Sequence, residues 1–151
     1  MQHLDSVYVE QLMGRLARLR ADAVPRWGRL RGDTLIEHLI WIVRHSMGRS
    51  TQVPFVGDWL TVRVIGPLAV RGWFPTPHNL QLPRSLRAQG IELREPGDLE
   101  TLHALLEEYL NLVQADELRP GLHPLFGDLG VDGWDRVHVL HFEYHLRQFG
   151  V

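Results

Sequence analysis

The chain has 151 residues, a length that favours one domain with a substantial core over two domains. Its 44% apolar and 23% charged residues are ordinary for a globular protein, and a formal net charge of −2 excludes a generally basic surface for nucleic acid. The absence of cysteine excludes disulfides, thiolate ligands and cysteine nucleophiles. The absence of lysine excludes Schiff-base chemistry and a Walker-type lysine. We therefore expect a single domain over residues 1–151, in which nitrogen and oxygen ligands would favour Zn, Ni, Fe or Mn.

The start of the chain lacks a basic segment followed by an apolar run, and no stretch approaches roughly 18 uninterrupted apolar residues. The expectation is a cytoplasmic protein without a membrane partner. The arginines are spread along the chain and form no recognition-helix pattern, so nucleic acid is not expected as a partner either.

The first predicted helix covers about residues 5–23, where apolar residues recur at helical spacing. Asp5 or Ser6 is a suitable N-cap, and Pro25 is expected to end the helix. Arginines occupy its other faces, which indicates a solvated side rather than a binding patch.

The second predicted helix begins at Asp33 or Thr34, and Thr34 with Glu37 has the spacing of a capping box. Gly48 is expected to end this helix. His38 shares its apolar stripe, so the imidazole is expected to point inward.

Segment 49–97 is interrupted by glycines and prolines and shows no settled periodicity. Within it, residues 58–71 fit either a short helix or a β-branched strand. Because so long a connection without regular structure is unusual, we expect at least one short helix in this crossover.

The third main helix is predicted over about 98–116, with Asp98 as its N-cap, and a turn-rich loop over 117–130 follows it. Asp132 is then expected to cap the last helix, Trp134–Phe149. Four amphipathic helices predict an all-α four-helix bundle, with a long connection between the second and third main helices.

The last helix carries an unusual inward stripe. At 100° per residue, Trp134, His138, His141, His145 and Phe149 fall on one face. Buried imidazoles cost free energy unless both ring nitrogens find partners, and a shared metal ion is the economical explanation for several together. Residue spacing allows either His138 with His141 or His141 with His145 to bind one ion, so the pair stays open at this point.

Three segments of the chain together resemble the DinB/YfiT-like superfamily of metalloenzymes. They read RWGRLRGDTLIEHLIWIVRHSMG over 26–48, HPLFGDLGVDGW over 123–134, and HVLHFEYHLRQFG over 138–150. The resemblance is strongest to a bacterial branch whose chains end in an H-x-x-H-H-L-x-Q-F-G-like string. It covers essentially the whole chain and is least distinctive over 49–97.

The resemblance implies a four-helix bundle with three histidines around a divalent metal, one from the second helix and two from an H-x-x-x-H on the last. Carried onto this sequence, these ligands are His38, His141 and His145. Tyr144 departs from the branch pattern, because many members have a further histidine there. That position is not a ligand, so the departure concerns the pocket edge rather than metal binding.

Three histidines leave open coordination positions, which is typical of a catalytic site, and a bound water there can reach a pKa near ~7. Relatives include thiol-dependent S-transferases and hydrolases, so the resemblance implies a metal-dependent enzyme acting on a small molecule, with a low-molecular-weight thiol as one candidate. Homodimers are common among these relatives, and a homodimer is a further expectation. The groups expected at the pocket or around the ligands are Trp41, His45, His138 and Gln148.

Two other functions remain open. A non-catalytic module would use the same site to bind a metal or ligand, with a carboxylate such as Glu37 or Glu108 closing the shell. A helical interaction protein would instead keep its histidines hydrogen-bonded in the core. Its stability would fall at low pH and would not respond to chelators.

Overall fold

The computed structural model describes residues 2–50, 53–73 and 84–151. The regular elements in these ranges are helical, and an isolated bridge joins His123 to Gly127. The prediction of an all-α protein is therefore confirmed. Within the same ranges, no helix is both long enough and apolar enough to cross a bilayer. The longer helices are α1 (Ser6–Leu16), α2 (Leu35–Ser46), α5 (Leu99–Gln114) and α6 (Gly130–Phe149).

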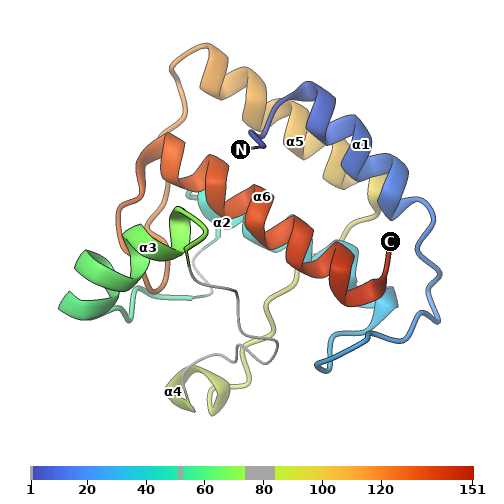
Figure 1. Ribbon diagram of the computed structural model, residues 1–151, viewed down its shortest axis with the longest axis horizontal. Helices are drawn as coiled ribbons and strands as arrows, with labels where there is room; N and C mark the ends of the chain where they lie inside the picture. The colour runs from blue at the N-terminus through green and yellow to red at the C-terminus, as the bar shows by residue number, and fades with distance from the viewer. Residues whose placement is uncertain (1, 51–52, 74–83) are drawn as a thin grey trace.

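Helices α1, α2, α5 and α6 pack together around the core (Figure 1). Both α1 and α2 contact α5 and α6, so each of the four helices touches two others. The fully buried apolar side chains come from all four helices and include Leu12, Leu35, Leu39, Ile40, Leu102, Leu106, Trp134, Phe142 and Leu146. This burial supplies the main free energy that holds α2 against α6.

Helix α1 begins where the sequence predicts, because the Asp5 carboxylate accepts a hydrogen bond from the amide of Tyr8 at 2.7 Å. It ends at Leu16, so the predicted extension to residue 23 is wrong. The reason is tertiary: the Arg15 guanidinium donates to Glu143 at 2.8 Å and to the carbonyl of Val151 at 2.9 Å. The chain then turns toward the end of α6 instead of continuing the helix.

The predicted capping box of α2 is wrong. A 3-10 turn, Gly32–Thr34, precedes the helix, and the Thr34 hydroxyl donates to the carbonyl of Arg31 at 3.2 Å. The Glu37 carboxylate accepts instead from Arg94 at 3.5 Å, so a distant partner has replaced the local one. The predicted end of the helix is confirmed, because Gly48 adopts a left-handed φ of 72°.

The N-cap of α5 is confirmed, since Asp98 accepts from the amide of Thr101 at 2.9 Å. The N-cap predicted for the last helix is wrong. Helix α6 begins at Gly130, which places Asp132 in its first turn. The Asp128 carboxylate accepts from the amide of Gly130 at 3.0 Å, so this earlier side chain binds the first free amide.

The region predicted as either helix or strand over 58–71 is helical. A π-helical turn, Thr61–Ile65, runs directly into α3 (Gly66–Val70), which contacts α6. The short helix α4 (Arg84–Arg87) follows at the lower edge of Figure 1. The expectation of a short helix within the connection is thus confirmed, while its residues 51–52 and 74–83 lie outside the described residues.

Replacement of a core leucine should be far more costly than replacement of an exposed one. Leu106 on α5 is fully buried, so Leu106→Ala is expected to lower the free energy of unfolding by about 2–5 kcal/mol. Leu122 is 53% exposed, and Leu122→Ala should change it by about 0.5 kcal/mol or less. Urea unfolding measures both values, and equal losses in the two variants would contradict this assignment of the core.

Candidate metal centre

Three imidazoles from two helices lie within ligand distance of one another. His38 comes from α2, while His141 and His145 come from successive turns of α6. One ring nitrogen of each lies within 4.8 Å of the other two. The Nε2 atoms of His38 and His141 are 3.1 Å apart. Two nitrogens at about 2.1 Å from one zinc ion would be about 3.0 Å apart at a right angle and about 3.4 Å at a tetrahedral angle. The observed spacing is therefore compatible with a shared cation.

The packing of α2 on α6 brings these rings together. The ring centroid of His38 lies 5.1 Å from that of His141 and 4.9 Å from that of His145. His138 has a different partner, because its Nε2 lies 2.8 Å from the hydroxyl oxygen of Ser46. Of the two pairs that spacing allows on the last helix, His141 and His145 are thus the pair that joins His38.

Two of the three rings form hydrogen bonds through Nδ1, which leaves their Nε2 atoms unprotonated. Nδ1 of His38 lies 2.6 Å from the carbonyl oxygen of Leu93. A carbonyl can only accept, so Nδ1 carries the proton and the lone pair lies on Nε2. His145 donates in the same way from Nδ1 to Oε1 of Gln148 at 2.8 Å. Such contacts fix the tautomer and ring orientation that a metal ligand requires.

The loop before α2 holds Gln148 in place. The amide Nε2 of Gln148 donates to the carbonyl of Trp27 at 2.8 Å, so its Oε1 must face His145. The amide of Arg26 donates to the backbone carbonyl of Gln148 at 2.7 Å. Gly28 has a left-handed φ of 79°, and a Cβ there would lie 2.8 Å from the Gln148 amide nitrogen. Glycine therefore permits the loop to approach α6 this closely.

Burial keeps the three histidines neutral near pH 7. It lowers the pKa of His145 to about 3, with the proximity of His38 adding to the effect and the bond to Gln148 opposing it. Burial and then its neighbours His145 and His38 hold the pKa of His141 well below its usual range. Burial also lowers the pKa of His38, although its bond to Leu93 acts in the opposite direction. Neutral imidazole is the form that binds metals.

The other residues expected around the ligands occupy different places. The ring of Trp41 stacks on His38, with centroids 5.8 Å apart and planes 21° apart, so it lies beside the cluster. Gln148 contacts His145 directly. His45 donates from Nε2 to the carbonyl of Leu122 at 2.9 Å, two turns along α2 from His38.

The two carboxylates considered as additional metal ligands, Glu37 and Glu108, pair with arginines instead. Glu37 pairs with Arg94 at 3.5 Å, and Glu108 pairs with Arg49 at 2.6 Å. Among the described residues, the candidate metal-binding group that contains His38 consists of histidines alone. A three-nitrogen donor set leaves positions for water or substrate on a divalent ion.

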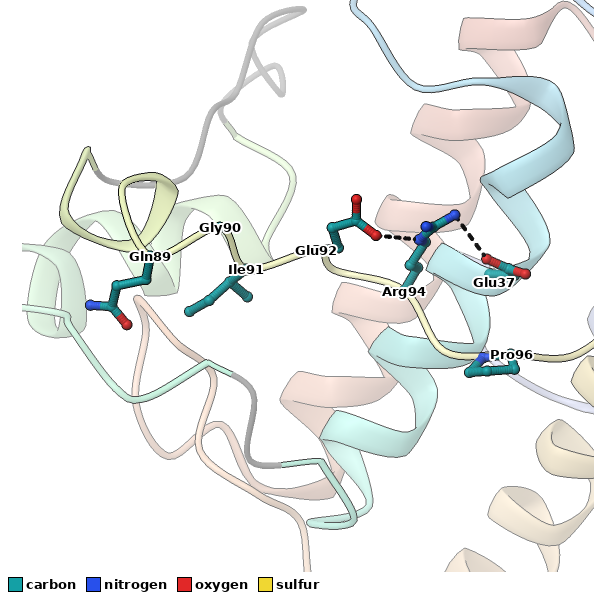
Figure 2. A pocket seen from close by; sticks show the side chains of 7 residues that line it. All are labelled: Glu37, Gln89, Gly90, Ile91, Glu92, Arg94 and Pro96. Carbon is teal, nitrogen blue, oxygen red and sulfur yellow. Dashed lines mark hydrogen bonds and ion pairs between the residues drawn. The ribbon is translucent and has the colours of Figure 1, made fainter.

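Open clefts border the two segments that orient the rings. A cleft of about 660 Å³ runs along residues 89–96, the segment that supplies the Leu93 carbonyl (Figure 2). A second cleft of about 460 Å³ is lined by residues between 21 and 32, in the loop that holds Gln148. Neither lining includes one of the three histidines, although His38 and His141 are themselves partly exposed.

Comparison with known proteins places this chain in a family. The family model described as "Protein of unknown function (DUF1569)" matches residues 2–150. The chain belongs to this family. Searches of curated proteins and of solved structures found no match. Since the match spans α2 and α6, all three clustered histidines lie within the DUF1569 domain.

The DUF1569 chain also has two further histidines beside the candidate metal centre, the fully buried His138 and the partly buried His123. His123 and His138 both contact the ring of Trp134, at centroid distances of 5.3 and 5.5 Å. Burial lowers the pKa of each to about 3, helped by the proximity of His45 to His123 and of His123 to His138. The helical pattern indicated His138, whereas His123 lies in a loop and was marked only as the first residue of the resembling segment 123–134.

The metal-free protein should lose stability as the pH falls below the ordinary histidine pKa. The pKa values of His123 and His138 are about 3 in the folded state and near 6.5 when unfolded, so the unfolded state takes up protons first. The loss should approach about 1.4 kcal/mol per pH unit for each histidine. Urea unfolding between about pH 7.5 and about pH 5, with a chelator present throughout, measures it. Constant stability over this range would contradict the burial of neutral histidines.

Proposed function

We propose that this DUF1569 protein is a divalent-metal-dependent enzyme, of hydrolase or thiol S-transferase type, that acts on a small molecule. The observation that carries the proposal is the convergence of His38, His141 and His145 from two helices. The Nδ1 bonds of His38 and His145 support it, because they leave Nε2 available to a cation. Zinc, nickel, iron and manganese all accept nitrogen donors, so the donor set alone does not select among them.

The proposal includes a four-helix bundle of the DinB/YfiT type, with segment 49–97 as its long connection. The pairwise packing of α1, α2, α5 and α6 supports this assignment. So does the sequence resemblance over 26–48, 123–134 and 138–150. A cytoplasmic location and a homodimer remain predictions.

A divalent ion bound here would supply Lewis acidity, lowering the pKa of a water or thiol and polarising the substrate. The chain's own residues would hold this ion through neutral imidazoles. The Leu93 carbonyl and the Gln148 amide keep two of these rings in the required orientation. The buried Trp41 ring lies nearly parallel to the His38 ring and packs beside it.

In the described part of the chain, the group around His38 consists of histidines without a carboxylate, which supports an enzyme over a closed binding module. Both candidate carboxylates, Glu37 and Glu108, already have arginine partners. A purely helical interaction protein would use the 3.1 Å contact between His38 and His141 only as a hydrogen bond. Metal analysis separates this last function from the other two.

Protein purified without a histidine tag and reconstituted with zinc, nickel, iron or manganese should retain one metal ion per chain. His141→Ala should lose most of this metal, because it removes one of three ligands. His103→Ala is the matched control, since His103 pairs with Glu10 at 2.9 Å, away from the site. Elemental analysis after dialysis provides the measurement.

Equal metal content in wild type and His141→Ala would contradict the proposed site. Assays with activated esters and with thiol–electrophile pairs then test turnover by the loaded protein. Activity that disappears with chelation and with His141→Ala supports an enzyme. A loaded protein with no metal-dependent turnover in either assay would favour the binding module.

Gln148→Leu should weaken metal binding without removing a ligand. The variant removes the acceptor that keeps the proton of His145 on Nδ1, so zinc affinity is expected to fall about 10- to 100-fold. Gln114→Leu makes the same chemical change at an exposed position at the end of α5 and should leave affinity unaltered. Competition with a chromophoric chelator gives both affinities. Wild-type affinity in Gln148→Leu would show that this hydrogen bond does not orient a ligand.

A further inference from the structure

A segment from the middle of the chain crosses one side of α2 beside His38. This segment, residues 91–96, is called the strap, and Figure 2 shows it passing across the helix. Its backbone bonds α2 at two places. The Leu93 carbonyl accepts from Nδ1 of His38 at 2.6 Å, and the Glu95 amide donates to the carbonyl of Glu37 at 3.0 Å. The strap thus supplies the atom that sets the tautomer of His38.

Apolar packing holds the strap near the helix without fixing its register. Ile91 and Leu93 are partly buried against the core. Hydrophobic burial is non-directional, so it tolerates small shifts along the helix. The bond to His38 does not tolerate them, because hydrogen bonds weaken steeply when distance and angle depart from the optimum.

The opposite side of the strap borders open space. Glu92, Arg94 and Pro96 line the cleft of about 660 Å³ shown in Figure 2. Leu93, between two of these residues, bonds His38. Packing from the cleft side therefore does little to press the Leu93 carbonyl against His38, so the directional contacts between the strap and α2 set its position.

An ion pair adds the shortest side-chain contact to the backbone bond between Glu95 and Glu37. Nη1 of Arg44 donates to Oε2 of Glu95 at 2.6 Å, and their side chains are only 34% and 15% exposed. A short, charge-assisted bond that is partly withdrawn from water holds its geometry better than an exposed pair. Arg44 lies on α2 seven residues after Glu37, so both lie on the side of the helix that the strap crosses.

We propose that Arg44 and Glu95 are positioning residues of the metal centre. Their ion pair holds the strap in register, so that the Leu93 carbonyl keeps the proton of His38 on Nδ1 and its Nε2 faces His141. The expected effect on metal affinity rests on the proposed metal-binding function. The effect of the ion pair on the His38 tautomer applies to the metal-free protein as well. Without the pair, His38 can carry its proton on either nitrogen and is a poorer ligand.

The test compares two arginine variants on the same stretch of chain. Arg44→Gln breaks the pair with Glu95, whereas Arg49→Gln breaks the 2.6 Å pair with Glu108, which does not touch the strap. Nitrogen-15 NMR of the metal-free proteins should show the Nδ1–H tautomer of His38 in wild type and Arg49→Gln, and a tautomer mixture in Arg44→Gln. Zinc affinity should fall about tenfold in Arg44→Gln alone.

Conservative variants separate positioning from a general loss of structure. Arg44→Lys should recover part of the zinc affinity, since an ammonium group can still bind Glu95. If Arg44→Gln does not fold, as judged by circular dichroism, Glu95→Gln replaces it and should show the same tautomer change. A His38 tautomer and zinc affinity identical to those of Arg49→Gln would overturn the proposal. A wild type that binds no zinc would overturn the metal-binding function, while the tautomer comparison would still decide the role of the pair.

Discussion

The approach of Nε2 of His38 to Nε2 of His141 is the constraint on which the account depends. Two imidazole lone pairs repel each other, so a 3.1 Å separation requires a proton or a cation between them. Because His38 keeps its proton on Nδ1, its Nε2 must accept, and His141 must donate in the metal-free protein. A cation would take the place of that proton and bind both rings. Neutral rings near pH 7 permit either arrangement.

Segments far from the ligands in sequence keep this arrangement in place. The strap, residues 91–96, fixes His38 from one side of α2. The loop before α2 fixes Gln148, and through it His145, from the end of α6. The site therefore depends on tertiary contacts of the connections as much as on the two helices. Tertiary contacts also replace local signals at the end of α1 and at the start of α2, where Arg15 and Glu37 bond to distant partners.

Side-chain patterns were sufficient to predict much of the fold. Helix α5 with its Asp98 cap and the end of α2 at Gly48 were readable because their signals are local. The stripe of histidines on α6 was readable from its period. Spacing could not choose between His138 and His145, and the resemblance favoured His145. In the structure, a contact with Ser46 on another helix holds His138 apart.

Other features carried no readable signal. The acceptors from Leu93 and Trp27 are backbone carbonyls, which every residue type has, so no residue pattern marks them. The end of α1 at Leu16 was also unreadable, because Arg15 looks like a solvated residue until the C-terminus of α6 is placed beside it. His123 lies in a loop, outside any helical period.

Anomalous X-ray diffraction from crystals of the zinc-reconstituted protein locates the ion relative to the three rings. We expect one anomalous peak at about 2.1 Å from a nitrogen of each of His38, His141 and His145. A zinc peak at the other histidines, or no peak among these three rings in fully reconstituted protein, would contradict it.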